Sequence, residues 1–211
     1  MCYSEEVSLA TFLIGIFGSI AVYTLGTTFD RIIALFLGYV AFMQAIEWLL
    51  WRHQQCDDYH KQVSVAGMFL NLLQPIVLGG LVLGLSPRTE NASFILASMA
   101  TYLAYAVYHS RQYTSNLQCT QPKDEDPHLV WNWTVLDSFP IMWFVYIATF
   151  FIISVLGMPT LRQGLLFGGG STIALFISIS IYQRQDVGAM WCFFTSFVPL
   201  SYYIVRKLGF L

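Results

Sequence analysis

The sequence predicts an all-α fold, an integral membrane bundle of seven transmembrane helices forming one domain over residues 1–211. Hydrophobic residues make up 56% of the chain and charged residues only 10%, whereas a soluble domain carries about 25% charged residues. The apolar residues gather in runs long enough for a helix to cross a hydrocarbon core about 30 Å thick. These runs are about twice as long as the strands of a membrane barrel, and they do not alternate.

Each apolar run is expected to be a helix, because every backbone group inside lipid needs a hydrogen-bond partner within the protein. The first run follows Glu5 and Glu6, whereas a removable secretory signal begins with basic residues, so we expect the run to stay in the protein. The predicted spans are Leu9–Gly26, Ile32–Trp51, Val63–Leu85, Ala92–Tyr108, Val135–Leu156, Gly164–Tyr182 and Ala189–Val205.

The basic residues predict the orientation of the bundle. Seven spans place the termini on opposite sides, and Lys and Arg divide equally between these sides. One set lies in much shorter connections, close to the span ends: Arg31, Arg88, Arg162, Arg206 and Lys207. The positive-inside rule therefore predicts an outer N-terminus and a cytoplasmic C-terminus. The chain has no basic patch, so a nucleic-acid partner is not expected.

Three of the four cysteines fall on the predicted outer side. Cys2, Cys56 and Cys119 lie there, while Cys192 lies within the last span. An oxidising compartment permits a disulfide between two of the three. The pairs Cys56–Cys119 and Cys2–Cys56 are favoured, and the sequence does not choose between them or exclude free thiols.

Four polar residues within the second and third spans predict the functional site. Glu47 is the one carboxylate well inside a span, and charged groups at such depth usually face the bundle interior. Gln44 lies on the same helical face, and Asn71 and Gln74 form a similar pair roughly 12 and 17 Å below the outer boundary. His109 and Asp137 are expected to cap this group. The alternatives are a polar cavity opening outward and simple hydrogen bonding between helices.

Prolines lie inside three predicted spans, at Pro75, Pro140 and Pro199, and can kink their helices. Pro75 follows Gln74 directly, and Gly79 and Gly80 come one turn later. A proline inside a helix removes a hydrogen bond and can kink the helix. One interpretation is a hinge or an opened backbone that lines a cavity; the other is ordinary bundle packing, for which membrane helices often use Gly and Pro.

All four histidines lie on the predicted outer side. The segment 53–60 contains His53, His60, Cys56 and two aspartates, so we consider a metal site at His53 and His60, although the spacing matches no zinc pattern. Retinal is not an expected cofactor, because the last span has no lysine for a Schiff base. The sequence therefore predicts no cofactor other than this metal candidate.

The chain resembles a family of small, uncharacterised polytopic membrane proteins from bacteria, algae and large DNA viruses, a domain of unknown function. The resemblance rests on Met1-Cys2-Tyr3-Ser4, Leu37-Gly38-Tyr39, Met43-Gln44-Ala45-Ile46-Glu47, Cys56, Gln74-Pro75 and His128-Leu129-Val130-Trp131-Asn132. It implies a shared membrane fold and a polar site in which Glu and Gln can exchange between the positions of Gln44 and Glu47. It implies no activity.

Three functions follow from these observations. The first is a transporter or channel for a proton, ion or small solute, with the polar residues lining its passage. The second is an integral-membrane enzyme at the outer interface, with acid–base or metal chemistry from histidines. The third is a structural or receptor-like bundle without flux. The expected partners are the lipid bilayer, a small solute or ion and, as an open alternative, further copies of the chain.

Overall fold

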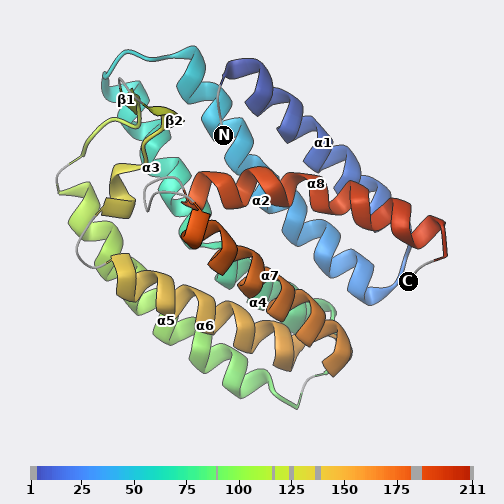
Figure 1. Ribbon diagram of the computed structural model, residues 1–211. Helices are drawn as coiled ribbons and strands as arrows, with labels where there is room; N and C mark the ends of the chain where they lie inside the picture. Colours follow the sequence, from blue (N-terminus) through green and yellow to red (C-terminus); the bar gives the residue numbers. More distant parts are fainter. Residues whose placement is uncertain are drawn as a thin grey trace.

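The computed structural model describes residues 4–88, 90–115, 117–123, 126–135, 139–181 and 187–209. In these ranges the chain is almost entirely helical (Figure 1). The α-helices are α1 (Glu5–Tyr23), α2 (Thr28–Arg52), α3 (Asp58–Leu72), α4 (Gln74–Leu85), α5 (Ala92–Thr114), α6 (Phe139–Gly157), α7 (Leu161–Ile181) and α8 (Val187–Lys207). The remaining elements are the strands β1 (Pro122–Lys123) and β2 (Asp126–Leu129) and the 3-10 helix η1 (Asn132–Val135).

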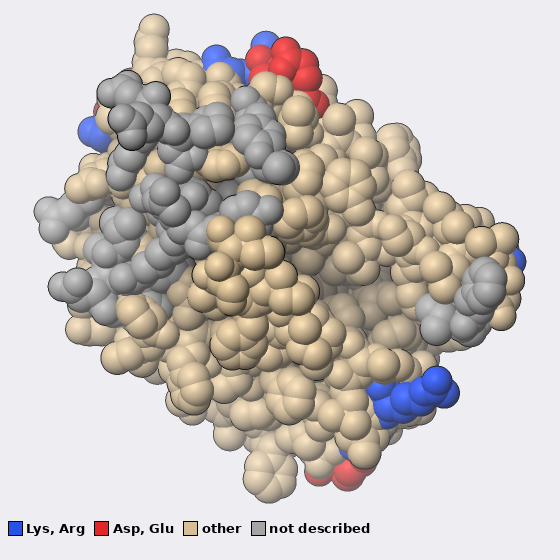
Figure 2. Space-filling model, in the orientation of Figure 1, with Lys and Arg blue, Asp and Glu red and all other residues tan. Residues whose placement is uncertain are grey.

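The all-helical, membrane-type fold agrees with the sequence. By length and composition α1, α2, residues 140–157 of α6 and α7 can each cross a membrane, and α3 with α4 forms a fifth candidate if the bent pair is one span. Figure 2 shows the charged residues of one face at its edges, around a broad uncharged middle. Seven spans are not confirmed: α5 and α8 are helices of 23 and 21 residues, but they are not among the described helices that are apolar enough to cross a membrane.

The helices pack as two groups. The first helix group contains α1, α2 and α8, which all contact one another. In the second helix group, α6 packs against α4, α5 and α7, and α4 also packs against α5. The groups meet where α2 contacts α4 and where α7 contacts α8, and α3 packs against α2 before it leads into α4. The interface between the groups therefore runs through the middle of the molecule (Figure 1).

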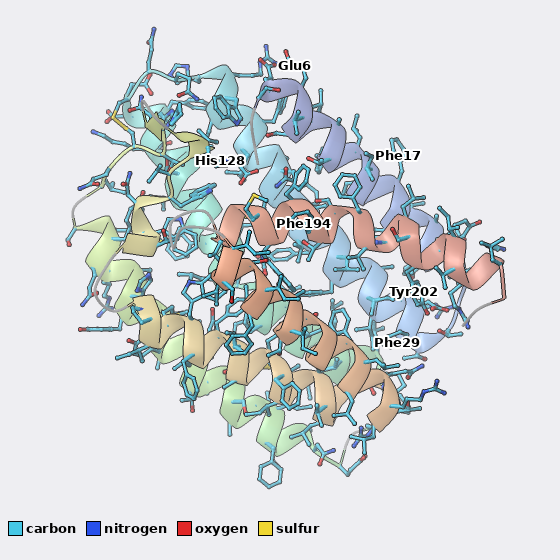
Figure 3. All side chains as sticks on the ribbon, viewed as in Figure 1. Glu6, Phe17, Phe29, His128, Phe194 and Tyr202 are labelled. Atoms are coloured by element: carbon cyan, nitrogen blue, oxygen red, sulfur yellow. A yellow bond between two sulfur atoms is a disulfide. The ribbon has the colours of Figure 1, made fainter. Side chains whose placement is uncertain are left out.

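Close backbone contacts hold the first helix group together. A Cβ atom on Gly18 of α1 would lie 2.7 Å from the backbone nitrogen of Leu200 on α8, so only glycine allows this approach. At the far end, Thr27 and Asp30 form a capping box at the start of α2. The buried Asp30 carboxylate accepts a hydrogen bond from the Tyr202 hydroxyl (2.7 Å). Phe29 and Tyr202 also lie edge to face there (Figure 3).

The third predicted span is not one continuous helix, as its boundaries Val63–Leu85 had implied. It consists of α3 and α4, which are bent by 46° relative to each other. Leu73 separates them. The physical reason is Pro75 in the first turn of α4, which has no N–H to continue the hydrogen bonds of α3. Of the two alternatives for this span, the break is therefore the one present, and it lies between Asn71 and Gln74.

A covalent and hydrogen-bonded cap covers the end of α2 and the start of α3. A disulfide joins Cys56 to Cys119, with Cα atoms 5.7 Å apart, which confirms one of the two predicted pairings. The Asn132 amide donates to the Cys119 carbonyl oxygen (2.6 Å). The strands β1 and β2 form an irregular antiparallel pair. This cap fixes the connection between α5 and α6 to the α2–α3 loop.

Candidate functional site

The first half of the predicted site lies between α1 and α2. Gln44 and Glu47 have no exposed surface. The Gln44 Nε2 donates to Glu47 Oε2 (2.8 Å), and the Gln44 Oε1 accepts from the Thr11 hydroxyl (2.8 Å). The amide thus holds the carboxyl group on one side and a hydroxyl of α1 on the other. Because the two residues are three positions apart on α2, one helical face presents both to the interior.

The second half lies at the break between α3 and α4. Gln74 has no exposed surface and Asn71 is 8% exposed. Both side-chain amides donate to the Cys192 thiol of α8, at 3.9 Å for Asn71 and 3.8 Å for Gln74. The Gln74 Oε1 accepts a short hydrogen bond from the Tyr146 hydroxyl of α6 (2.5 Å). Side chains from α6 and α8 therefore meet at the amides of the broken segment.

Two further tyrosines bind the backbone at the break. The Tyr39 hydroxyl of α2 donates to the Leu70 carbonyl oxygen (2.9 Å). The Tyr102 hydroxyl of α5 donates to the Leu72 carbonyl oxygen (2.6 Å). Since a break in a helix frees carbonyl groups that must find partners in an apolar interior, these tyrosines stabilise the broken conformation.

The two halves adjoin each other across the interface between the helix groups. The Cys192 thiol, which accepts from both amides, lies close enough to the Glu47 carboxyl group to interact with it electrostatically. We call the assembly the polar centre. Its members are Thr11, Tyr39, Gln44, Glu47 and Cys192 from the first helix group and Asn71, Gln74, Tyr102 and Tyr146 from α3 and the second helix group.

The polar centre is closed in this conformation. Its four predicted residues are at most 8% exposed, so a passage open to the outside is not formed at them. A void of about 10 Å³ lies beside Asn71, bordered by Trp133, Met142 and Tyr146. Such a space is about large enough for one water molecule. This closed network fits interhelical hydrogen bonding as it stands. A cavity that opens outward would require another conformation of the same residues.

The histidines of the segment 53–60 hold the cap together. His60 is fully buried, and its Nδ1 and Nε2 lie 2.5 and 2.8 Å from the carbonyl oxygens of His53 and Thr120. Both ring nitrogens are therefore engaged by the backbone. His53 pairs with Asp57 (2.8 Å). The pKa of the Asp57 carboxyl is lowered, chiefly because it accepts the backbone N–H of His60 and then because it pairs with His53. Among the described residues, no three His, Cys, Asp or Glu side chains are arranged to hold a metal ion.

The remaining predicted residues are His109, Asp137 and Cys2. His109 is fully buried on α5. Asp137 and Cys2 lie outside the described residues, as does the Met1-Cys2-Tyr3 part of the motif. The sequence reasoning overlooked Thr11, Tyr39, Tyr102 and Tyr146. A signal for the tyrosines existed, because a phenol hydroxyl in a long apolar run needs a hydrogen-bond partner when buried.

Comparison with known proteins yields no match, since no family model, no curated protein and no solved structure matches this chain. The resemblance to the uncharacterised membrane family stays a prediction, and function rests on the residues of the polar centre.

Proposed function

We propose that the protein is a membrane transporter for a proton or a small polar solute, with the polar centre as its binding site and Glu47 as the group that takes up the proton. In this proposal the seven predicted segments all cross the bilayer, α3 and α4 together form one broken span, and the N-terminus lies outside. The observation that carries the proposal is the buried Glu47 carboxyl group, which interacts electrostatically with Cys192, the thiol that the amides at the break in a candidate membrane span also contact.

The position of the polar centre between two helix groups supports the proposal. Many secondary transporters bind their cargo near the bilayer midplane, between two bundles that rock against each other. Here Gln44, Glu47 and Cys192 come from the first helix group, whereas Tyr102 and Tyr146 come from the second. A relative movement of the groups would change the contacts of Cys192 with Gln74 and Asn71. Rocking of the two helix groups would therefore change the hydrogen bonds of the proposed binding site.

The broken helix supports the proposal independently. Transporter sites are typically built at discontinuous helices, whose interrupted backbone and side chains bind the cargo. The break at Leu73 is flanked by the two amides Asn71 and Gln74, and its freed carbonyls already bind hydroxyl groups. A cargo that donates hydrogen bonds, such as water, hydronium or a small polar solute, can replace these hydroxyls as a partner.

The test is proton flux into liposomes. The purified protein is reconstituted with a trapped pH-sensitive dye, and flux is driven by a potassium diffusion potential. For Glu47→Gln, which keeps the shape and the Gln44 contact, we expect flux to fall about a hundredfold, the lower end of what a positioned proton-transferring group contributes. Glu90→Gln is the matched control, because Glu90 is an exposed carboxylate of a connection, 63% accessible.

Each outcome decides the proposal. Wild-type flux no higher than that of empty liposomes would exclude proton transport. Equal flux in wild type and Glu47→Gln would remove Glu47 from the pathway. If Glu47→Gln and Gln74→Leu both keep the fold and the flux, the polar centre only locks helices together and is not the transport site.

A further inference from the structure

An apolar groove runs along the interface between the two helix groups, on a different side from the polar centre. It has a volume of about 470 Å³ and is bordered by α2, α7 and α8. Its floor contains Phe36 and Val40 of α2, which are 2% and 1% exposed. Figure 1 shows α7 and α8 diverging from their shared connection, and Figure 2 shows the surface hollowed between them.

Two hydroxyl groups in the lining of the groove, on Thr195 and Ser178, donate no hydrogen bond to a ligand. Thr195 of α8 donates to the Trp191 carbonyl oxygen (2.8 Å), and Ser178 of α7 donates to the Ala174 carbonyl oxygen (3.0 Å). Both hydroxyls are turned back to their own helices and present carbon to the groove. Since pockets for polar ligands place a few polar groups toward the ligand, the chemistry of this groove selects a hydrocarbon.

The rims of the groove open toward the membrane. Phe194 on α8, labelled in Figure 3, is 47% exposed. Ile177 on α7 is 53% exposed. Both α2 and α7 are candidate membrane spans, and only 22% of the most apolar part of α7 is buried. In a bilayer this opening faces acyl chains, because the groove lies at the level of the middle of α2.

The dimensions of the groove suit a long, narrow ligand. Its lining on α7 extends from Leu166 to Ile181, which is about 22 Å at the helical rise of 1.5 Å per residue. Its volume of about 470 Å³ falls in the range of roughly 300–1,000 Å³ that ligand pockets have. A flexible hydrocarbon chain can therefore lie along the groove.

We infer that the groove is a binding site for a single acyl chain of a bilayer lipid, lying lengthwise between α7 and α8 on the floor formed by α2. The chain separates the two helix groups at this side and fills the space that their side chains leave. This site does not rest on the proposed transport function, because it uses different residues and a different ligand.

The experiment uses the full chain in phosphatidylcholine vesicles that contain a small fraction of phosphatidylcholine with a photoreactive diazirine in one acyl chain. After illumination, labelled residues are located by mass spectrometry. We expect labelling of Ile177 and Phe194 to exceed by several-fold that of Phe17 and Phe144, which are 64% and 72% exposed on outer surfaces of α1 and α6.

A pair of glycine variants tests whether the groove itself binds the chain. A Cβ atom on Gly170 or on Gly169 meets nothing within 4 Å, but only Gly170 borders the groove. Gly170→Leu should therefore lower labelling of Phe194 several-fold, whereas Gly169→Leu should leave it unchanged. Circular dichroism and thermal unfolding check that both variants fold.

Two results would overturn the inference. The first is found in the wild-type protein and so does not depend on whether a variant folds. If Phe194 is labelled no more strongly than Phe17, the groove holds only bulk lipid. A change of oligomeric state in Gly170→Leu, with no change in labelling, would assign the groove to protein contacts instead.

Discussion

The polar centre and the apolar groove lie at the same interface between the two helix groups, yet one is closed and the other is open. Helix α2 borders both of them. Gln44 and Glu47 toward its C-terminal end face the polar centre, whereas Phe36 and Val40, nearer its middle, face the groove. The same helix therefore borders both regions with different kinds of side chain.

The difference shows how each kind of side chain determines packing. A buried amide or carboxyl group in an apolar interior costs several kcal/mol unless it finds a partner, so Gln44 and Gln74 draw Thr11, Tyr146 and Cys192 into contact. Apolar side chains in a membrane make no such demand, because lipid tails are as apolar as they are. The polar centre therefore closes the interface, and the apolar side can stay open to lipid.

The largest effect is expected from adding volume on α3 at Gly67, one helical turn before Asn71 of the polar centre. A Cβ atom on Gly67 of α3 would lie 2.5 Å from the Trp131 ring and 3.0 Å from Ile46, so Gly67→Val must displace a large ring. We expect a loss of about 3 kcal/mol in the free energy of unfolding. Gly170→Val, beside the groove, should change it by less than about 0.5 kcal/mol.

The measurement is reversible unfolding in mixed detergent micelles, with both variants and wild type compared under the same conditions. Equal losses in Gly67→Val and Gly170→Val would mean that the groove is as tightly packed as the polar centre, and the comparison between the two regions would fail.

Removing hydroxyl groups should give the next largest effect. Tyr146→Phe leaves Gln74 Oε1 without its donor in an interior where Gln74 has no exposed surface, so we expect a loss of about 1–2 kcal/mol. Thr195→Val in the groove removes a hydroxyl that donates only to its own helix, and should cost less than about 0.5 kcal/mol.

The same unfolding assay checks this pair, and both substitutions nearly conserve volume. A loss in Thr195→Val as large as that in Tyr146→Phe would show that hydroxyls in the groove also carry the packing, so that the two regions do not differ in this respect.

The sequence predicted the polar residues of the site better than their partners. Gln44, Glu47, Asn71 and Gln74 are buried as expected, because a polar residue in an apolar run can be recognised from its neighbours alone. The break at Pro75 could also be predicted, since the missing N–H is a local property. The division of the four residues over two adjoining halves depends on how the helices cross, which a span pattern does not contain.

The groove could not be predicted at all. Its lining residues, such as Ile177 and Phe194, are ordinary members of apolar spans, and nothing in their spacing distinguishes a residue that faces a groove from one that faces lipid. The groove arises because α7 and α8 diverge, which is a property of the whole bundle. The pairing of Cys56 with Cys119 was likewise one of several alternatives until the cap brought the two residues together.

The smallest effect is expected at the cap that contains the disulfide, where water can replace a side chain as a partner. Asp57 is exposed, and its pKa is lowered by the backbone N–H of His60 first and by His53 second. A carboxyl group whose pKa is lower in the folded state stabilises the fold above its ordinary pKa of about 4 and loses this contribution as the pH falls through the lowered value. The melting temperature of Asp57→Asn should therefore lie below that of wild type near neutral pH, and the gap should close in acid.

The gap between Tyr146→Phe and wild type should stay constant over the same range, because the Gln74–Tyr146 pair is an amide and a phenol that carry no charge there. A gap for Asp57→Asn that does not depend on pH would mean that the cap is held by the disulfide and His60 alone.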